Sequence, residues 1–148
     1  MKLSAIQRAY ISGFLDGDGS VYVQTKRNAS YRYGYQIAPA IVFFQSAKSE
    51  DSFKEFHRLL NLGNMRKRKD GILEITVNRI AEIRELISFV KPYVRMKRRQ
   101  IELLEQILSA KEQIEDEDDF FALRELVDAY RNLNYSKKRK RIVDPVET

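Results

Sequence analysis

Two aspartates near the N-terminus stand in a glycine-rich segment that could bind a divalent metal ion. Asp16 and Asp18 alternate with Gly17 and Gly19 directly after an apolar run. Carboxylate and carbonyl oxygens are the ligands that hard cations such as Mg²⁺ prefer. The chain has no cysteine and a single histidine, His57, so it cannot build a zinc site and any metal must be bound through oxygen.

The same segment has two other interpretations. An Asp-Gly-Asp-Gly sequence is also typical of a turn that ends a helix and binds nothing. A calcium-binding loop of the EF-hand type starting at Asp16 would need glycine where Val21 stands and glutamate where Arg27 stands. The calcium loop is therefore excluded, and the choice between turn and metal site depends on the surrounding residues.

The residues before the aspartates predict a helix with one nearly bare face. Ser4 and Gln7 have the spacing of a capping box, so the helix is expected to begin near Ser4 and to be broken by the glycine-rich segment. Ala9, Gly13 and Gly17 lie four residues apart on one face. Without side chains beyond a methyl group, this face would let a second helix approach closer than the usual separation of about 8–10 Å. We expect that second helix to belong to another copy of the chain.

The composition predicts a single soluble, intracellular domain. The chain has 148 residues, of which 43% are hydrophobic, enough for one core. No apolar run approaches the length of a membrane span, and the N-terminus lacks the pattern of a secretory signal. The absence of cysteine excludes a disulfide framework. Abundant Lys, Arg, Glu and Tyr without Cys or Trp also fit a thermophile, though weakly.

The charge distribution indicates a polyanionic partner. The net charge is +6, but residues 112–119 hold six acids and no base, which leaves +12 on the other 140 residues. A surface that basic favours nucleic acid. The alternative is that the charge serves only solubility.

Alternating sequence patterns predict an antiparallel sheet. Residues 21–26 predict a strand, 27–30 a turn, and 31–44 one long strand or two joined at Pro39. Residues 64–78 predict a hairpin that turns at Asp70 and Gly71. Its first strand carries four cations, residues 66–69, which suits a surface that faces phosphates. The alternative is an edge strand protected against aggregation.

Four more helices are expected. The first lies within residues 49–61 and is capped by Ser49 or Asp51, and the second is capped by Asn78 and ends at Pro92. The third begins with residues 94–100, and the fourth covers about 119–133. His57 flanks the apolar stripe of the first, and we expect it to pack rather than to react. The order predicts an α+β domain with a curved antiparallel sheet, covered by helices on one face and bare and polar on the other. A two-stranded ribbon fits the major groove of DNA.

Strand parity selects the residues that would contact bases or phosphates. These are Tyr22, Gln24, Lys26, Arg32, Gln36, Arg66, Arg68, Glu74 and Thr76. Arginine can pair with guanine through two hydrogen bonds, and glutamine with adenine. Strands of about 8 residues at ~3.3 Å each, plus turns, give two copies a reach of roughly 20 base pairs.

Residues 11–19, Ile-Ser-Gly-Phe-Leu-Asp-Gly-Asp-Gly, resemble the motif of the LAGLIDADG homing endonucleases. Ile11, Ser12 and Gly17 depart from its letters Leu, Ala and Ala, and all three still permit close helix packing. The predicted order of elements resembles that fold along nearly the whole chain. The resemblance therefore implies a single-motif, homodimeric DNA endonuclease.

The resemblance also implies roles for individual residues. Asp18 aligns with the last acid of the motif and would be catalytic and a metal ligand, with the carbonyl of Gly17 as a second ligand. Asp16 aligns with the earlier acid and would form hydrogen bonds within the protein. Gln45, expected in the loop after the long strand, and Lys97 would complete the catalytic set. Further contacts with DNA would come from Lys48, Lys137 and Lys140.

Hydrolysis of DNA constrains the assembly. A two-metal mechanism needs ions at both the attacking and the leaving oxygen, and one carboxylate is too few for that. We therefore expect an isologous homodimer joined through Ala9, Gly13 and Gly17, with a pseudo-palindromic target. Mg²⁺ is the expected cofactor, Mn²⁺ could replace it, and Ca²⁺ would bind without supporting cleavage. The resemblance further implies 3′ overhangs and an intron-encoded protein.

The expected partner is double-stranded DNA, with no membrane and no small-molecule cofactor, in the cytoplasm or nucleoid of a prokaryote or in an organelle. Two other functions stay open. One is a DNA- or RNA-binding protein of the same fold that has lost cleavage, such as an intron maturase or a regulator. The other is a basic protein that coats nucleic acid. We expect residues 1–141 to form one domain and 142–148 a flexible tail.

Overall fold

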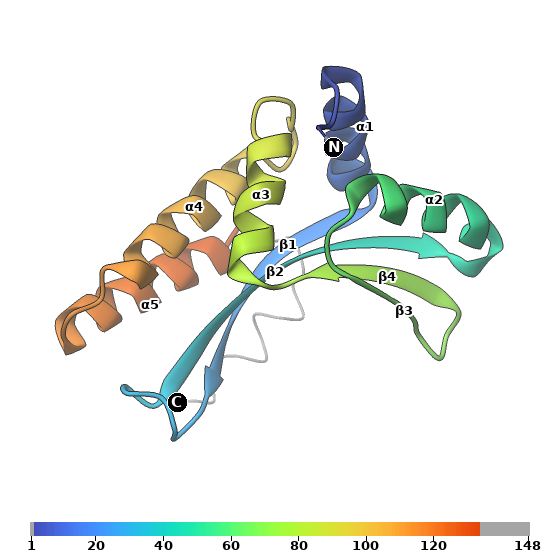
Figure 1. Ribbon diagram of the computed structural model, residues 1–148. Helices are drawn as coiled ribbons and strands as arrows, with labels where there is room; N and C mark the ends of the chain where they lie inside the picture. The colour runs from blue at the N-terminus through green and yellow to red at the C-terminus, as the bar shows by residue number, and fades with distance from the viewer. Residues whose placement is uncertain (1, 134–148) are drawn as a thin grey trace.

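Within residues 2–133, which the computed structural model describes, four strands form one antiparallel sheet with five α-helices on one side (Figure 1). The predicted α+β class is confirmed. The elements are α1 (Ala5–Asp18), β1 (Gly19–Arg27), β2 (Tyr35–Ser46), the short 3₁₀ helix η1 (Ala47–Ser49), α2 (Glu50–Leu60), β3 (Asn64–Lys67), β4 (Ile72–Val77), α3 (Ile80–Val90), α4 (Arg98–Glu112) and α5 (Glu117–Arg131). No helix in this part of the chain has the length and apolar character that crossing a membrane requires.

The strand order is β1-β2-β4-β3, so β1 and β3 are the edges of the sheet. β1 pairs with β2 along its whole length, from Gly19 opposite Phe43 to Arg27 opposite Tyr35. On its other side, β2 pairs with β4, but only over its C-terminal half, from Ile41 onward. Pro39 therefore lies where β2 has β1 as its only neighbour, and β2 continues through it as one strand.

Helix α1 begins as predicted but ends later. Ser4 and Gln7 form the capping box, with distances of 3.1 Å and 2.9 Å for the two reciprocal hydrogen bonds. The predicted break within the glycine-rich segment is confirmed, but it falls at the end of that segment, because α1 continues to Asp18 and Gly19 is its C-cap. A Cβ at Gly19 would lie 2.5 Å from Leu15 Cδ1 and 2.8 Å from the Leu15 carbonyl oxygen. Only glycine lets the chain pass so directly from α1 into β1.

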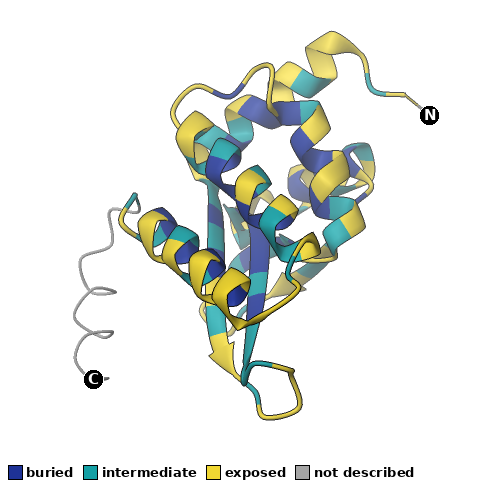
Figure 2. Ribbon diagram, turned by 90° about the vertical axis from the view of Figure 1, so that its left-hand side faces the viewer, coloured by how far each residue is buried: buried dark blue, intermediate teal, exposed yellow. Residues whose placement is uncertain are grey.

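The core lies between the sheet and the helices (Figure 2). Alternate residues of every long strand face it, as predicted from parity: Val21, Val23, Ile37, Ile41, Phe43, Leu73, Ile75 and Val77 are all buried. Phe14 of α1 stacks on Phe56 of α2 with 4.4 Å between ring centroids, which joins the two helices above this layer. The His57 Nε2–H group donates a hydrogen bond to the Gly63 carbonyl at 3.0 Å, which agrees with a packing role.

Two predicted strand boundaries are wrong because the turns beside them are longer than expected. Residues 31–34 were expected in a strand but lie in the β1–β2 turn, where the Asn28 N–H donates to the Gly34 carbonyl at 2.8 Å. Arg32 therefore has no strand parity. Arg68 lies in the β3–β4 turn, because the Gly71 N–H donates to its carbonyl at 3.0 Å.

Two helix starts also differ from the prediction. Arg79, rather than Asn78, is the N-cap of α3. α4 begins at Arg98, with Lys97 as its N-cap, so the residues from 94 onward form the approach to the helix rather than its first turn. The reason for the second difference is a set of contacts with Asp16, described next.

Candidate active site and nucleic-acid interface

The C-terminal end of α1 meets the N-terminal end of α4 through Asp16. Its carboxylate accepts the backbone N–H groups of Arg95 at 2.8 Å, Met96 at 3.2 Å and Lys97 at 3.1 Å. Three donors in a row hold the chain in the form of a small anion-binding loop at the start of a helix, where negative charge is stabilised. The prediction that Asp16 forms hydrogen bonds within the protein is thus confirmed in its geometry.

Lys97 is brought to the same place. Its Nζ donates to the Asp16 carbonyl oxygen at 3.0 Å, and its side chain is half-buried. The last carbonyls of a helix have no donor within the helix and carry partial negative charge. α1 has no basic residue of its own in its last turn, so α4 supplies one from another part of the sequence.

Asp18 and Gly17 are exposed beside this junction. Within residues 2–133, Asp18 makes no hydrogen bond or ion pair, and no group of three His, Cys, Asp or Glu residues could hold a metal ion. Asp18 offers a carboxylate, and the terminal carbonyls of α1 offer further oxygens at the negative end of the helix. These donors suit a hard cation but are too few to enclose one, so further ligands must come from outside the described chain.

Gln45 lies one strand away from Asp18. The prediction that it occupies a loop is wrong, because it is part of β2 and pairs with Leu73. Since Gly19 pairs with Phe43, Gln45 lies two residues, or about 7 Å along the strand, from the start of β1. Its Oε1 accepts the Ser46 N–H at 2.8 Å, which leaves the amide NH₂ with no partner in the described part of the chain.

The small-residue face of α1 is open. Ala9, Gly13 and Gly17 are exposed, and a Cβ added at Gly13 or Gly17 would meet nothing within 4 Å. Next to this face, Ile6 is 82% exposed and Tyr10 58% exposed. Packing among residues 2–133 thus explains neither glycine, nor the exposed apolar side chains beside them.

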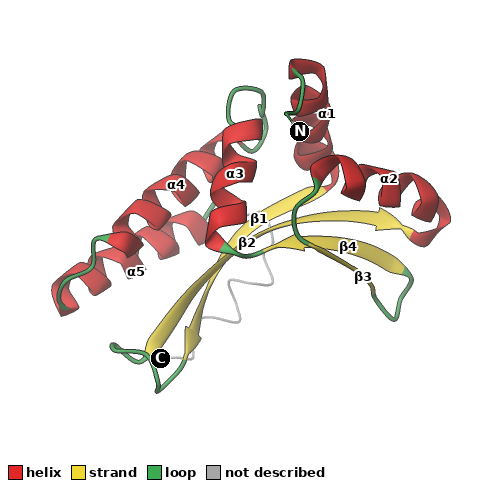
Figure 3. Cartoon of the chain, in the orientation of Figure 1, coloured by secondary structure: helices red, strands yellow, loops and turns green. Residues whose placement is uncertain are grey.

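The other face of the sheet carries no helix of residues 2–133 (Figure 3). Tyr22, Gln24, Lys26, Gln36, Arg66, Glu74 and Thr76 have the strand parity of this face, as predicted. The expectation of a uniformly polar face is wrong at its centre, where β2 contributes Ala40 and Val42, which are 5% and 3% exposed. Polar and basic residues therefore flank a central apolar stripe.

Glu74 organises the charged part of this face. It accepts a hydrogen bond from Arg66 Nη2 at 3.1 Å and lies 3.5 Å from Arg68 Nη1. Arg68 Nη2 also donates to the Asp70 carboxylate at 2.8 Å, so both predicted guanine-reading arginines are paired with acids of the protein. Burial raises the pKa of the Tyr22 hydroxyl above its ordinary value of 10.0, and the negative charge of Glu74 raises it further. Tyr22 is therefore neutral at physiological pH and can both donate and accept a hydrogen bond.

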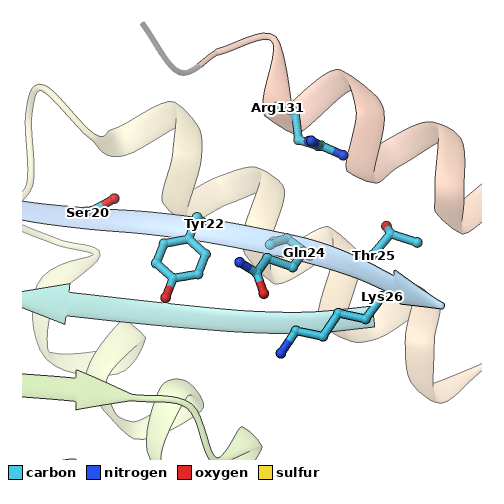
Figure 4. Close-up of a pocket in the computed structure, with 7 residues that line it drawn as sticks. Ser20, Tyr22, Gln24, Thr25, Lys26 and Arg131 are labelled. Atoms are coloured by element: carbon cyan, nitrogen blue, oxygen red, sulfur yellow. The ribbon is translucent and has the colours of Figure 1, made fainter. Parts of the chain in front are cut away.

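A groove along the free edge of β1 adds one residue that the sequence analysis missed. It is lined by Ser20, Tyr22, Val23, Gln24, Thr25 and Lys26 of β1 and by Arg131 at the end of α5 (Figure 4). Arg131 makes no ion pair with the described residues. The sequence gives no signal for it, because a basic residue in the last turn of a helix is commonly there for the helix itself.

The remaining predicted contacts are partly placed. Lys48 is exposed in η1, just beyond the end of β2. Arg32 is exposed in the β1–β2 turn, with its guanidinium 5.2 Å from the centre of the Tyr33 ring. Lys137 and Lys140 lie outside the described residues, as does the predicted tail at 142–148.

Known proteins match this arrangement in sequence and in structure. DNA endonuclease I-CvuI of Chlorella vulgaris is 28% identical over 138 residues, covering 93% of this chain and 86% of that protein. DNA endonuclease I-CreI of Chlamydomonas reinhardtii is 28% identical over 135 residues, covering 88% and 80%. The crystal structure of I-CvuI with its target in the presence of Ca has a TM-score of 0.83 at 27% identity, covering 90% of this chain and 85% of the other.

The homing endonuclease I-TnaI, at 21% identity and a TM-score of 0.77 over 95% and 96% of the two chains, shares the fold. The sequence profile described as LAGLIDADG endonuclease matches residues 11–108. This match covers more than half of the chain and includes Asp16, Asp18, Gln45 and Lys97. The chain therefore belongs to the LAGLIDADG endonuclease family.

Proposed function

We propose that two copies of this chain form a homodimer that cleaves both strands of a long, pseudo-palindromic DNA target with Mg²⁺ as cofactor. As a member of its family, the chain is a homing endonuclease, a hydrolase that cuts DNA. The observation that carries the finer proposal is Asp18, which is exposed and unpaired within residues 2–133 at the end of a helix whose adjacent face is open.

The argument for two copies comes from what one copy lacks. A single exposed carboxylate cannot hold ions at both the attacking and the leaving oxygen of a phosphodiester. If Gly13 and Gly17 of two α1 helices meet, the two Asp18 residues that follow lie close to the same axis. The isologous contact would also bury Ile6 and Tyr10, which are otherwise exposed.

The donor set fits a hard divalent cation. Asp18 and the Gly17 carbonyl would hold it, together with the oxygens of the scissile phosphate. When bound, the ion would polarise the phosphate and lower the pKa of a bound water. I-CvuI structures were solved with DNA in the presence of Mg or Ca, which supports a requirement for a divalent metal and leaves the choice of Mg²⁺, with Mn²⁺ as substitute and Ca²⁺ as inactive ligand, as our proposal.

The protein's own side chains would do the rest. Lys97 lies at the same helix end as Asp18 and would offset the negative charge that develops on the phosphate. The free amide of Gln45 would orient the attacking water. Asp16 would fix Lys97 in place through the three backbone hydrogen bonds.

The bare face of the sheet would lie in the major groove. Its polar residues from β1, β2, β3 and β4 would read bases, and Lys26, Lys48 and Arg131 at its margins would contact phosphates. Two copies would span roughly 20 base pairs. We place the protein inside the cell, in whichever compartment holds its target DNA, in a prokaryote or an organelle.

The test is a selection of bound duplexes from a randomised pool, followed by cleavage of the selected DNA with Mg²⁺ or with Ca²⁺. We expect a two-fold symmetric consensus, cleavage with Mg²⁺ only, and loss of cleavage but not of binding in Asp18→Asn. Asp128→Asn, an equal change of charge at an exposed position of α5, is the control. A consensus without cutting in any metal would indicate a binding protein of the same fold, and the absence of a consensus would indicate a coating protein.

A further inference from the structure

The outer half of the β1–β2 hairpin extends beyond the rest of the sheet. Tyr22–Arg27 of β1 pairs with Tyr35–Ala40 of β2, and neither segment has a third strand beside it. A two-stranded ribbon of this kind is marginally stable alone. Yet it carries Gln24, Lys26 and Gln36, three of the residues predicted to contact DNA. Something must therefore hold the ribbon at a fixed angle.

Helix α5 lies along the helix-covered side of this ribbon from end to end. Near its C-terminal end, the Tyr130 hydroxyl donates to the Val21 carbonyl at the base of the ribbon. Near its N-terminal end, the Phe120 ring stacks on Tyr33 at 5.2 Å and lies 6.3 Å from Tyr35, at the tip. Phe120 is 4% exposed and belongs to the core, and the half-buried rings of Tyr33 and Tyr35 pack against it. α5 thus contacts both ends of a ribbon that has no third strand beside it. Figure 1 shows the helix on the same side of the sheet as α4.

Cations complete the contact at the tip. The Arg124 guanidinium, one helical turn after Phe120, lies 4.5 Å from the centre of the Tyr35 ring. Arg27, which pairs with Tyr35 across the ribbon, lies 5.9 Å from the same ring. Such cation–aromatic contacts favour one relative position of helix and ribbon, whereas aliphatic packing would tolerate sliding.

We infer that Phe120 and Arg124 are positioning residues that set the base preference at the outer ends of the DNA target. This inference rests on the proposed function. The nine residues of β1 span about 30 Å, so the ribbon tip lies roughly nine base pairs from the active site at its base. The unsupported part is about 20 Å long, and a tilt of about 10° would move its tip by about 3.5 Å. Base readout tolerates a misplacement of only about 0.5 Å.

The experiment measures cleavage of a set of targets, each altered at one base pair of the selected consensus. In Phe120→Leu we expect discrimination at the outer base pairs to fall by about tenfold, the value of one well-placed side-chain contact. Discrimination near the cut site and the rate at saturating DNA should stay as in the wild type, because Asp18 and Lys97 do not depend on the ribbon tip. The DNA concentration for half-maximal rate should rise.

Two matched variants separate this effect from general damage. Phe121→Leu makes the same change one residue along, where the ring is 49% exposed, and should keep the wild-type profile. Tyr33→Phe keeps the stacked ring and removes a hydroxyl that is buried without a partner among the described residues. This variant should also keep the wild-type cleavage profile.

If Phe120→Leu does not fold, Arg124→Met provides the answer, since it removes only the cation over Tyr35 and should give a smaller loss at the same base pairs. Full outer discrimination in the folded variant would overturn the inference, as would equal losses at inner and outer positions. A wild-type chain that selects no consensus would instead contradict the proposed function, and the inference with it.

Discussion

Adding one methyl group to Gly13 of α1 should strengthen the fold of a single chain and weaken the enzyme. The structure leaves nothing within 4 Å of a Cβ at Gly13, so the monomer has room for alanine. Alanine is favoured over glycine inside a helix by about 0.8–1.0 kcal/mol, because glycine loses more backbone freedom on folding. For a chain of this size we expect the midpoint of thermal unfolding to rise by about 3 °C.

Gly19→Ala is the matched opposite. Its Cβ would lie 2.8 Å from the Leu15 carbonyl oxygen and 3.0 Å from Leu15 Cα, so the backbone itself must move. Overpacking of this kind costs about 1–3 kcal/mol. Both substitutions replace glycine by alanine, at positions six residues apart. The structure predicts effects of opposite sign on the stability of one chain.

In the proposed homodimer we expect the effect of Gly13→Ala to reverse. Two added methyl groups would stand between helices that we expect to approach closer than about 8–10 Å. Misplacing reacting groups by about 1 Å costs about 100-fold in rate. We therefore expect the dissociation constant of the dimer to rise at least tenfold and cleavage to fall by about 100-fold. Thermal unfolding would be recorded at a concentration where the wild type is monomeric, because association itself stabilises the fold.

Analytical ultracentrifugation and cleavage assays on the same samples complete the test. A Gly13→Ala variant that is more stable and still dimerises and cuts like the wild type would refute the reasoning, because α1 would then not form the interface. A variant that is less stable as a monomer would show that the space around Gly13 is already occupied.

Three further changes test other parts of the site. Asp16→Asn should lower the free energy of unfolding by about 1–2 kcal/mol, seen in urea titrations, because an amide cannot accept all three backbone hydrogen bonds. Arg131→Gln should reduce the slope of log affinity against log salt by about 0.9 per protomer without changing base preference, as expected for a phosphate contact. Tyr22→Phe should remove from an ultraviolet pH titration a tyrosine that ionises at higher pH than a free tyrosine, because the pKa of Tyr22 is raised by burial and by Glu74. Since that pKa is raised, the stability linked to the neutral phenol is fully present below pH 10.0 and is lost above it.

The sequence predicted the faces of elements better than their ends. Parity placed Val21 and Val23 in the core and Tyr22 and Gln24 on the open face, because a half-buried strand must alternate. The end of the β1–β2 turn was misjudged, because the hydrogen bond from the Asn28 N–H to the Gly34 carbonyl depends on three-dimensional closure and leaves no periodic signal.

The site was predictable only where its parts lie close together in the sequence or follow the family motif. The pairing of α1 with the start of α4 joins residues about 80 positions apart, and no local pattern links the carboxylate of Asp16 to the backbone of Arg95. Arg131 was missed for the same reason, since its relation to β1 arises only when α5 packs along the strand. Gln45 was identified by resemblance, although its element was wrong.

Neighbouring residues of the motif at the end of α1 lie on different faces of the helix, and each face has a different contact. Ile11 and Leu15 point into the core and are fully buried, while Gly13 and Gly17 point outward where nothing of the described chain meets them. A helix offers about 3.6 residues per turn, so these two pairs already use two of its faces. The positions of the two acids on the helix are therefore restricted to the remaining faces.

The two aspartates have the same side chain and differ only in their surroundings. Asp16 turns toward α4 and neutralises the positive end of that helix, and in doing so it draws Lys97 to the negative end of α1. Asp18, two residues later, is exposed and takes no part in that contact, and its carboxylate stays unpaired within the described chain. Exchanging their environments would pair the proposed metal ligand with α4 and leave α4 without its carboxylate. The proposed site therefore needs both acids at this spacing, one to place the lysine and one to remain free for a cation.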